Sequence, residues 1–192
     1  MNSSACLAIF ISGSGSNAEK IIEHFQHHES IKVGLLLSNN GAAYGLQRAA
    51  RYNIPTLVFT KTQFRESDEI VTILKAAGIT HIVLAGFLWL IPDNLIAAFP
   101  LRILNIHPAL LPKFGGKGMY GMRVHEAVCA AREIETGITI HEVNAHYDEG
   151  KIIAQHKCTI EKTDTPESIA QKVQQLEHQY YPVEIENWIR TS

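Results

Sequence analysis

The sequence predicts an α/β fold in which helices cover both faces of a mainly parallel sheet. Short apolar runs, typical of buried strands, alternate with segments of helical periodicity as far as Ile106. A glycine-rich turn joins the first run to the first helix, as is common in parallel sheets. Of the 192 residues, 46% are hydrophobic and 19% are charged, which allows one domain (1–192) with a substantial core.

The elements of the parallel part follow from local pattern. Strands are expected where leucine, isoleucine or valine form short continuous runs, and helices where apolar residues recur at intervals of three and four. Gly78 is expected to end one helix and Pro92 to begin another. The expected strands are 7–11, 32–37, 56–59, 82–85 and 101–106, and the expected helices are 18–28, 43–52, 66–77 and 92–99.

The pattern changes after Pro112. A glycine-rich loop and one helix come first, and then two strands whose connection is too short for a helical crossover, so that they are expected to be antiparallel. Thr165 as N-cap and Pro166 at the first helical position begin a long helix that is expected to run to Tyr180. These segments are the loop 113–121, the helix 124–132, the strands 135–143 and 151–159, and the helix 166–180.

Composition excludes several classes of protein. The net charge is −2 with the two signs interspersed, so neither a nucleic-acid surface nor a membrane surface is expected. The N-terminus lacks the features of a signal peptide, and no segment is apolar enough to span a bilayer. Cys6, Cys129 and Cys158 form no CxxC pair, which indicates free thiols in a reducing compartment. The expected location is the cytoplasm.

The loop Ser12–Asn17 predicts a phosphate site. It joins a buried strand to a helix, so its backbone N–H groups can approach an anion at the positive end of the helix. Gly13 and Gly15 also fit a loose dinucleotide fingerprint, but the second strand ends in Ser38–Gly41 without the carboxylate that a ribose diol requires. This favours a simpler phosphate over NAD. The alternative is a tight turn that merely requires glycine.

Asn105 and His107 follow an apolar run, two residues apart, so their side chains are expected on one face of the strand. An amide and an imidazole that converge at a strand end can stabilise a carbonyl that becomes an oxyanion. Pro108 and Pro112 fix the backbone that follows. The alternative is a strand end with two solvated polar groups.

Three segments are expected at one edge of the sheet, because the carboxyl ends of parallel strands lie together and ligands bind there. They are the Ser12–Asn17 loop, the apolar segment 86–91 and the 105–107 stretch. The apolar segment either lines a pocket for a flat ligand or belongs to the core. The shared location strengthens the functional interpretation of all three.

Asp148, in a polar turn, is the carboxylate expected to pair with His107. Such a pairing would raise the pKa of the imidazole and fix one tautomer, so that His107 could donate a proton or stabilise an oxyanion. The alternative is an ordinary turn aspartate.

Metal and nucleophile chemistry are not expected. His107, His141, His146 and Asp148 are potential metal ligands, but no HExxH motif is present and their spacing does not suit one helical face. No Gly-x-Ser-x-Gly motif occurs, and no cysteine lies beside a glycine-rich loop.

Together these motifs resemble the phosphoribosylglycinamide formyltransferase family over essentially the whole chain. The Asn-x-His-Pro stretch with a late Asp-x-Gly is typical of folate formyltransferases, and the Gly-Ser-Asn loop with a late Glu-His indicates the glycinamide ribonucleotide branch. The motifs, in order, are Ser12–Asn17, Leu84–Phe87, Asn105–Pro112, His146–Gly150 and Glu177–Pro182. The resemblance implies a Rossmann-like formyltransferase fold.

The resemblance also implies roles for individual residues. Asn105, His107 and Asp148 match the catalytic trio, and Asn105 also contacts the folate cosubstrate. The remaining matches are phosphate-binding Gly15, Ser16 and Asn17, substrate-binding Gln174 and Glu177, the pterin-pocket residues Leu88, Trp89, Leu90 and Ile91, and Lys61 or alternatively Arg65 as a basic folate contact. Trp89 stands where an arginine is common, and the loop 115–121 also departs from the better-known form.

The implied reaction transfers the formyl group of 10-formyltetrahydrofolate to the amine of 5-phosphoribosylglycinamide in purine (IMP) biosynthesis. The amine attacks directly and forms a tetrahedral intermediate, without a metal, in a monomer or homodimer. The alternatives are another folate formyltransferase or a formyl hydrolase, which usually carry an extra domain, and a non-catalytic nucleotide-binding module.

Overall fold

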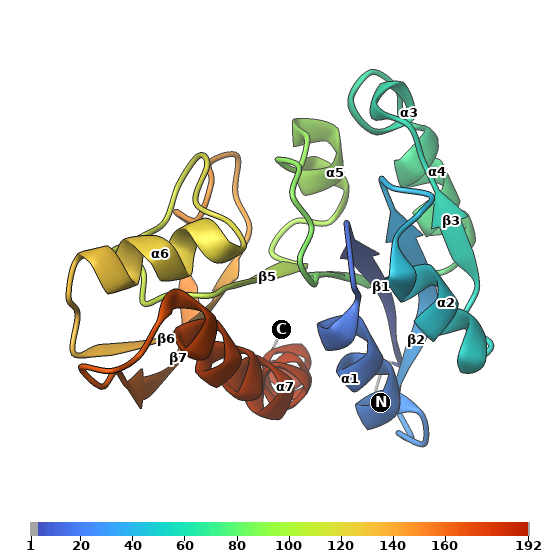
Figure 1. Ribbon diagram of the computed structural model, residues 1–192. Helices are drawn as coiled ribbons and strands as arrows, with labels where there is room; N and C mark the ends of the chain where they lie inside the picture. The colour runs from blue at the N-terminus through green and yellow to red at the C-terminus, as the bar shows by residue number, and fades with distance from the viewer. Residues whose placement is uncertain (1–3, 192) are drawn as a thin grey trace.

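One seven-stranded sheet organises residues 4–191, which are the residues that the computed structural model describes (Figure 1). The strand order is β3-β2-β1-β4-β5-β6-β7. Strands β1 to β5 pair in parallel, whereas β6 is antiparallel to both β5 and β7. The predicted parallel sheet with late antiparallel strands is therefore confirmed.

The strands lie within a few residues of their predicted positions. Their central members are apolar throughout, because a parallel strand covered on both faces has no solvated side. The strands are β1 Ala5–Ile11, β2 Ile31–Ser38, β3 Thr56–Val58, β4 His81–Leu84, β5 Ile103–His107, β6 Glu135–Glu142 and β7 Ile152–Thr159.

The helices include one that the sequence pattern did not predict. Helix α3 is too short for a periodic apolar stripe, but Thr60 and Gln63 form a capping box at its start. The helices are α1 Ser16–Phe25, α2 Tyr44–Arg51, α3 Lys61–Arg65, α4 Glu69–Ala76, α5 Asp93–Ala98, α6 Met122–Ala130 and α7 Pro166–Thr191.

Helix α7 corrects the predicted end at Tyr180, because it continues through Pro182 to Thr191. A proline inside a helix costs about 3 kcal/mol. The side chains of Tyr181, Ile185 and Trp188 are 0%, 0% and 3% exposed. Burying each of them contributes about 2 kcal/mol, so tertiary packing outweighs the local cost of the proline.

The core lies on both faces of the sheet, and β1 shows this directly. Leu7, Ile9 and Ile11 pack into the cluster that contains α1 and the buried side of α7. Ala8 and Phe10 point to the other face, into the cluster with α4 and α5. The alternation fixes the register of β1, since a shift by one residue would exchange the two sets.

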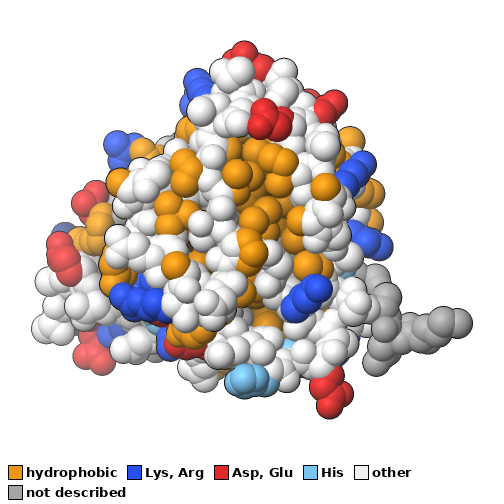
Figure 2. Space-filling model, turned by 90° about the vertical axis from the view of Figure 1, so that its right-hand side faces the viewer, with side chains coloured by type: hydrophobic (Ala, Val, Ile, Leu, Met, Phe, Trp, Pro, Cys, Tyr) orange, Lys and Arg blue, Asp and Glu red, His pale blue; other side chains and the backbone are white. Residues whose placement is uncertain are grey.

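Strand β3 forms one edge of the sheet and faces the viewer in Figure 2, where apolar side chains run down the middle of the surface. Val58 is 49% exposed on this edge. Among residues 4–191, no helix is long and apolar enough to cross a membrane. Cys6, Cys129 and Cys158 are all free thiols.

Candidate active site

A cavity of about 730 Å³ opens at the carboxyl ends of the parallel strands. Its walls come from segments that are far apart in the sequence, as expected for a parallel sheet. They are the loop 13–17, the segment 84–91, the end of β5 at 105–108, the loop 116–123, the turn 146–148 and one side of α7 from 170 to 177. All three segments that the sequence placed at this edge therefore line one cavity.

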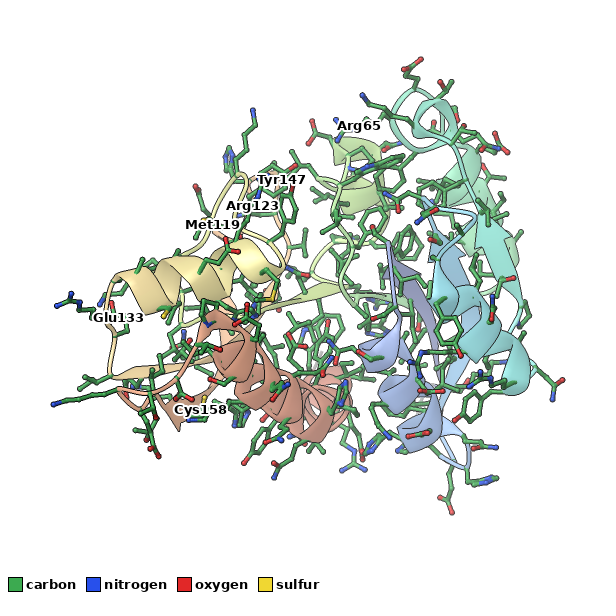
Figure 3. The ribbon with its side chains drawn as sticks, viewed as in Figure 1. Arg65, Met119, Arg123, Glu133, Tyr147 and Cys158 are labelled. Carbon is green, nitrogen blue, oxygen red and sulfur yellow. The ribbon has the colours of Figure 1, made fainter. Side chains whose placement is uncertain are left out.

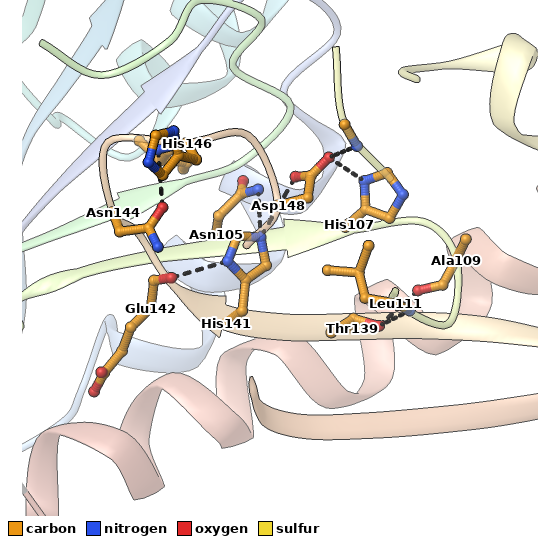
Figure 4. Close-up of polar contacts among 12 residues, drawn as sticks. Asn105, His107, Ala109, Leu111, Thr139, His141, Glu142, Asn144, His146 and Asp148 are labelled. Carbon is orange, nitrogen blue, oxygen red and sulfur yellow. Dashed lines mark hydrogen bonds and ion pairs between the residues drawn. The ribbon is translucent and has the colours of Figure 1, made fainter. Parts of the chain in front are cut away.

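Asn105, His107 and Asp148 converge in this cavity (Figure 4). Nδ1 of His107 lies 3.5 Å from Oδ2 of Asp148. The His107 side chain is 4% exposed and that of Asp148 is 11% exposed, so the pair is largely shielded from water. The structure thus brings together the two groups whose meeting could not be read from spacing.

Asp148 is positioned by the turn that follows strand β6, through its own backbone conformation and through the close approach of Gly150 to the end of that strand. The residue has a φ of 57°, in the left-handed region where Asp and Asn are tolerated better than most residues. Gly150 passes so close to the carbonyl of Glu142 that a Cβ would clash with it. The backbone N–H of Gly116 donates to Oδ2 of Asp148 over 2.9 Å, which links the glycine-rich loop to the carboxylate.

The segment after His107 is fixed by buried hydrogen bonds. The hydroxyl of Thr139 donates to the carbonyl of Ala109 over 2.7 Å and accepts from the N–H of Leu111 over 2.9 Å. The amide of Gln155 donates to the carbonyl of Leu111 over 3.0 Å. Antiparallel β6 and β7 thereby hold the wall that carries the catalytic candidates.

Burial lowers the pKa of His107 below its usual value of 6.5. The charge of Asp148 and the carbonyl of Phe114 raise the pKa, but they do not offset burial, and His141 lowers it further. The prediction that Asp148 raises the pKa of His107 above its usual value was therefore wrong. It considered the attraction between the carboxylate and the imidazolium, but not the loss of solvation on burial. Since the Phe114 carbonyl only accepts, Nε2 of His107 carries the proton in this 2.7 Å contact.

Asp148 is ionised at neutral pH. Burial alone would raise the pKa of this carboxyl, but His141, His107 and the N–H of Gly116 together lower it below its usual value of 3.8. The cavity therefore holds a fixed negative charge beside an imidazole that is neutral in the absence of substrate.

The other end of the cavity is formed by the loop before α1 and by α7. Gly15 has a φ of 70°, and a Cβ there would clash with Gly45, so the loop requires glycine. The amide of Asn17 donates to Glu177 over 2.9 Å, and the amide of Gln174 lies 3.4 Å from the hydroxyl of Ser16. Burial raises the pKa of Glu177, although Asn17 opposes this. All five predicted substrate residues are thus gathered here.

The apolar segment Leu88, Trp89, Leu90 and Ile91 lines the same cavity. Behind it lies the core, because the Trp89 ring packs within 6.0 Å of Phe59 and within 5.8 Å of Phe64, measured between ring centroids. Both sequence interpretations hold in part, since the segment is at once pocket wall and core.

Lys61 is not brought to the cavity. It lies exposed on α3, and Arg65 lines a separate, open hollow together with Leu90 and Ile91. In Figure 3, Arg65 lies at the top of the view near α3, whereas Met119, Arg123 and Tyr147, which line the main cavity, lie to its left above α6. A basic contact to a ligand in this cavity is therefore better placed at Arg123 than at Lys61.

Sequence reasoning did not assign a role to His125 and His141, which both line the cavity and are 6% and 2% exposed. His141 was considered only as a potential metal ligand. Its position opposite Asn105 depends on the register of β5 and β6, which no local pattern encodes. Within residues 4–191, no group of three His, Cys, Asp or Glu side chains has the arrangement of a metal site.

Comparison with known proteins identifies close relatives. The formyl transferase family model matches residues 5–185. The chloroplastic phosphoribosylglycinamide formyltransferase of Arabidopsis thaliana is 45% identical over 187 residues, which are 91% of this chain and 62% of that protein. The phosphoribosylglycinamide formyltransferase of Bacillus subtilis is 35% identical, over 91% of this chain and 90% of that protein.

The fold agrees with these matches. The crystal structure of glycinamide ribonucleotide transformylase 1 from Symbiobacterium toebii superimposes with a TM-score of 0.89 at 30% identity, covering 98% of this chain and 89% of that one. The chain spans about three fifths of the two plant relatives that it matches, 62% and 58% of their lengths.

Proposed function

This chain belongs to the phosphoribosylglycinamide formyltransferase family, and we propose that it transfers the formyl group of 10-formyltetrahydrofolate to the amine of 5-phosphoribosylglycinamide in purine biosynthesis. One observation carries the proposal. Asn105, His107 and Asp148 meet in a cavity that also contains a glycine-rich loop at a helix N-terminus. One cavity therefore contains a site for the phosphate of the ribonucleotide and a site for the formyl carbonyl of the folate.

The phosphate of the ribonucleotide binds at the start of α1. No side chain caps the start of this helix, and the first N–H groups of a helix have no partner within it, so those of Gly15, Ser16 and Asn17 can bind an anion that the helix dipole also favours. Gln174 and Glu177 on α7 face this loop and hold the rest of the ribonucleotide. This anchoring orients the glycinamide amine towards β5 and reduces the entropic cost of reaction.

The folate enters against the apolar wall Leu88–Ile91, which suits a flat ring system. Its formyl oxygen lies against the side-chain amide of Asn105. When the amine attacks the formyl carbon, the C=O becomes an oxyanion that accepts a hydrogen bond from Nδ2 of Asn105. Loss of one such donor typically costs about 10²–10³ in rate.

His107 moves the proton. It is neutral in the free enzyme, and its Nε2–H is held by the Phe114 carbonyl, so Nδ1 is the nitrogen that can accept a proton from the attacking amine. Asp148, 3.5 Å away, stabilises the resulting imidazolium. The proton then goes to N10 of the folate as the C–N10 bond breaks, which yields the formylated amine and tetrahydrofolate. No covalent enzyme intermediate is required.

We further propose that the chain works in the cytoplasm as a monomer or homodimer that binds no nucleic acid. Three free thiols suit a reducing compartment, and all residues of the proposed site come from one chain.

A formyl-transfer assay with a panel of amines tests the proposed function. Purified protein is mixed with 10-formyltetrahydrofolate and 5-phosphoribosylglycinamide, and formylated product and tetrahydrofolate are measured together. The expected result is stoichiometric release of both, with little turnover of glycinamide or of water. Folate release without a formylated amine would indicate a formyl hydrolase instead. Binding of the ribonucleotide without turnover would indicate a non-catalytic nucleotide-binding module.

A further inference from the structure

His141 lies directly opposite Asn105 in the antiparallel pairing of β5 and β6. Its side chain is 3% exposed and lines the active-site cavity. It is outside the trio to which the proposed reaction assigns chemical roles. Two hydrogen bonds and one longer ionic contact define its surroundings (Figure 4).

The tautomer of His141 follows from its backbone partner. Nδ1 lies 2.9 Å from the carbonyl oxygen of Glu142, which can only accept a hydrogen bond. Nδ1 therefore carries a proton, and in the neutral ring Nε2 presents a lone pair. A Cβ at Gly150 would clash with the same Glu142 carbonyl and would lie 3.5 Å from Nδ1. Glycine at this position therefore leaves the carbonyl free to accept from the ring.

This lone pair determines the orientation of the Asn105 amide. Nδ2 of Asn105 lies 3.1 Å from Nε2 of His141 and donates to it. If the amide were rotated by 180°, Oδ1 would face the same lone pair, and two acceptors would repel each other. An amide nitrogen has two hydrogens, so the second N–H of Asn105 is left for another acceptor.

We propose that His141 is a positioning residue for formyl transfer, which holds the Asn105 amide with its nitrogen directed at the developing oxyanion. The inference deepens the proposed function and rests on it. Without His141, the amide can present Oδ1 or Nδ2 to the formyl oxygen, and only one of these two orientations stabilises negative charge. A preorganised donor is more effective than one that must be reoriented during the reaction.

His141 also contacts a second member of the trio, Asp148. Oδ1 of Asp148 lies 3.6 Å from Nε2 of His141, longer than the contact from Asn105. Through this contact, an imidazolium at His141 lowers the pKa of Asp148 and also acts on His107, and in that form Nε2 carries a proton and no longer accepts from Asn105. The experiment therefore has to separate action through Asn105 from action through Asp148.

Two substitutions of His141 separate its contacts. In His141→Asn, the shorter amide can still donate to the Glu142 carbonyl, but nothing reaches Asn105. In His141→Gln, an amide oxygen takes approximately the place of Nε2 and can accept from Asn105. The control is His156→Gln, which removes a half-buried imidazole on β7 that contacts Glu184 outside the cavity.

We expect His141→Asn to lower kcat about tenfold and to change the KM values for the ribonucleotide and the folate less than threefold. The substitution removes the fixed orientation of the Asn105 amide but no contact to either substrate. His141→Gln should recover kcat to within about threefold of the unsubstituted enzyme, and His156→Gln should leave kcat unchanged. Unaltered kcat in His141→Asn would overturn the inference. A purely structural role would lower thermal stability without this recovery.

Double substitution identifies the group through which His141 acts. In an Asn105→Ala background, His141→Asn should cause no further loss of kcat, whereas in an Asp148→Asn background it should still cost about tenfold. The reverse pattern would assign His141 to Asp148 and overturn the inference.

A measurement on the unsubstituted protein is independent of activity and of variant folding. Nitrogen-15 NMR of histidine-labelled protein, recorded over a range of pH, should show that the neutral form of His141 is protonated on Nδ1 and unprotonated on Nε2. A neutral ring protonated on Nε2 would overturn the inference even if formyl transfer occurs. Conversely, the expected tautomer in a protein that transfers no formyl group would overturn the proposed function, and only the hydrogen bond from Asn105 to His141 would stand.

Discussion

Replacing Asp148 by Asn removes a charge from the proposed proton path and leaves the backbone almost undisturbed. Asn tolerates the left-handed conformation of this position, where φ is 57°, better than Ala does. Its side-chain oxygen can still accept from the N–H of Gly116, so the glycine-rich loop keeps its contact. The variant therefore tests the carboxylate charge and not the fold.

The expected loss follows from the distance between Asp148 and His107. At 3.5 Å and an effective dielectric constant of about 20, the attraction between carboxylate and imidazolium is about 5 kcal/mol. If the imidazolium is fully formed in the transition state, loss of this attraction lowers kcat by between about 10³ and 10⁴. We expect a decrease of at least about 10³-fold, since the pKa of His107 also falls further once the charge is gone and proton acceptance from the amine weakens.

Steady-state formyl transfer to 5-phosphoribosylglycinamide measures this loss, with thermal unfolding as the check on integrity. The matched control is Glu149→Gln, which removes the same charge one residue away on an exposed side chain outside the cavity. Glu149→Gln should keep kcat. A kcat for Asp148→Asn within about threefold of the unsubstituted enzyme would refute the role assigned to the carboxylate.

Three further outcomes are expected. His107→Gln should lower kcat by about 10²–10³ while the melting temperature stays within a few degrees, and near-normal turnover would remove His107 from the mechanism. Asn17→Ala should raise KM for the ribonucleotide about tenfold through loss of its contact with Glu177, with a smaller effect on kcat; an unchanged KM would contradict the phosphate end of the site. The pKa of buried His81 is about 4 instead of 6.5, so the unfolded chain takes up a proton first as pH falls. The free energy of unfolding, measured by chemical denaturation, should therefore drop by about 3 kcal/mol between pH 6.5 and 4, and His81→Gln should remove that drop. An equal drop in both proteins would show that His81 does not cause it.

The sheet could be predicted from the sequence because its strands are buried on both faces. A run such as Leu7–Ile11 has no polar position, which distinguishes it from a surface strand or an amphipathic helix. The antiparallel end was predictable for a different reason, since the connection between β6 and β7 is too short for a crossover.

The errors in the fold prediction arose where distant contacts decide local structure. Pro182 is a local signal for the end of a helix, but the burial of Tyr181 and Trp188 extends α7 beyond it. Helix α3 was missed because five residues carry no periodicity, although Thr60 and Gln63 gave a readable capping signal.

Site prediction was limited in the same way. Asn105 and His107 share one strand, so their proximity follows from spacing alone. Their relation to Asp148 and His141 depends on the register between β5 and β6 and on the turn that follows, which single-sequence patterns do not give. The direction of the His107 pKa was wrong because burial, its largest cause, is a property of the folded chain.

A crystal structure with 5-phosphoribosylglycinamide and a folate analogue that cannot transfer its formyl group tests the central claim most directly. We expect the phosphate on the backbone N–H groups of Ser16 and Asn17, and the amine facing the folate carbon beside Asn105 and His107. The folate oxygen should lie within hydrogen-bond distance of Nδ2 of Asn105. A phosphate bound elsewhere in the cavity, or a folate oxygen directed away from Asn105, would contradict the account.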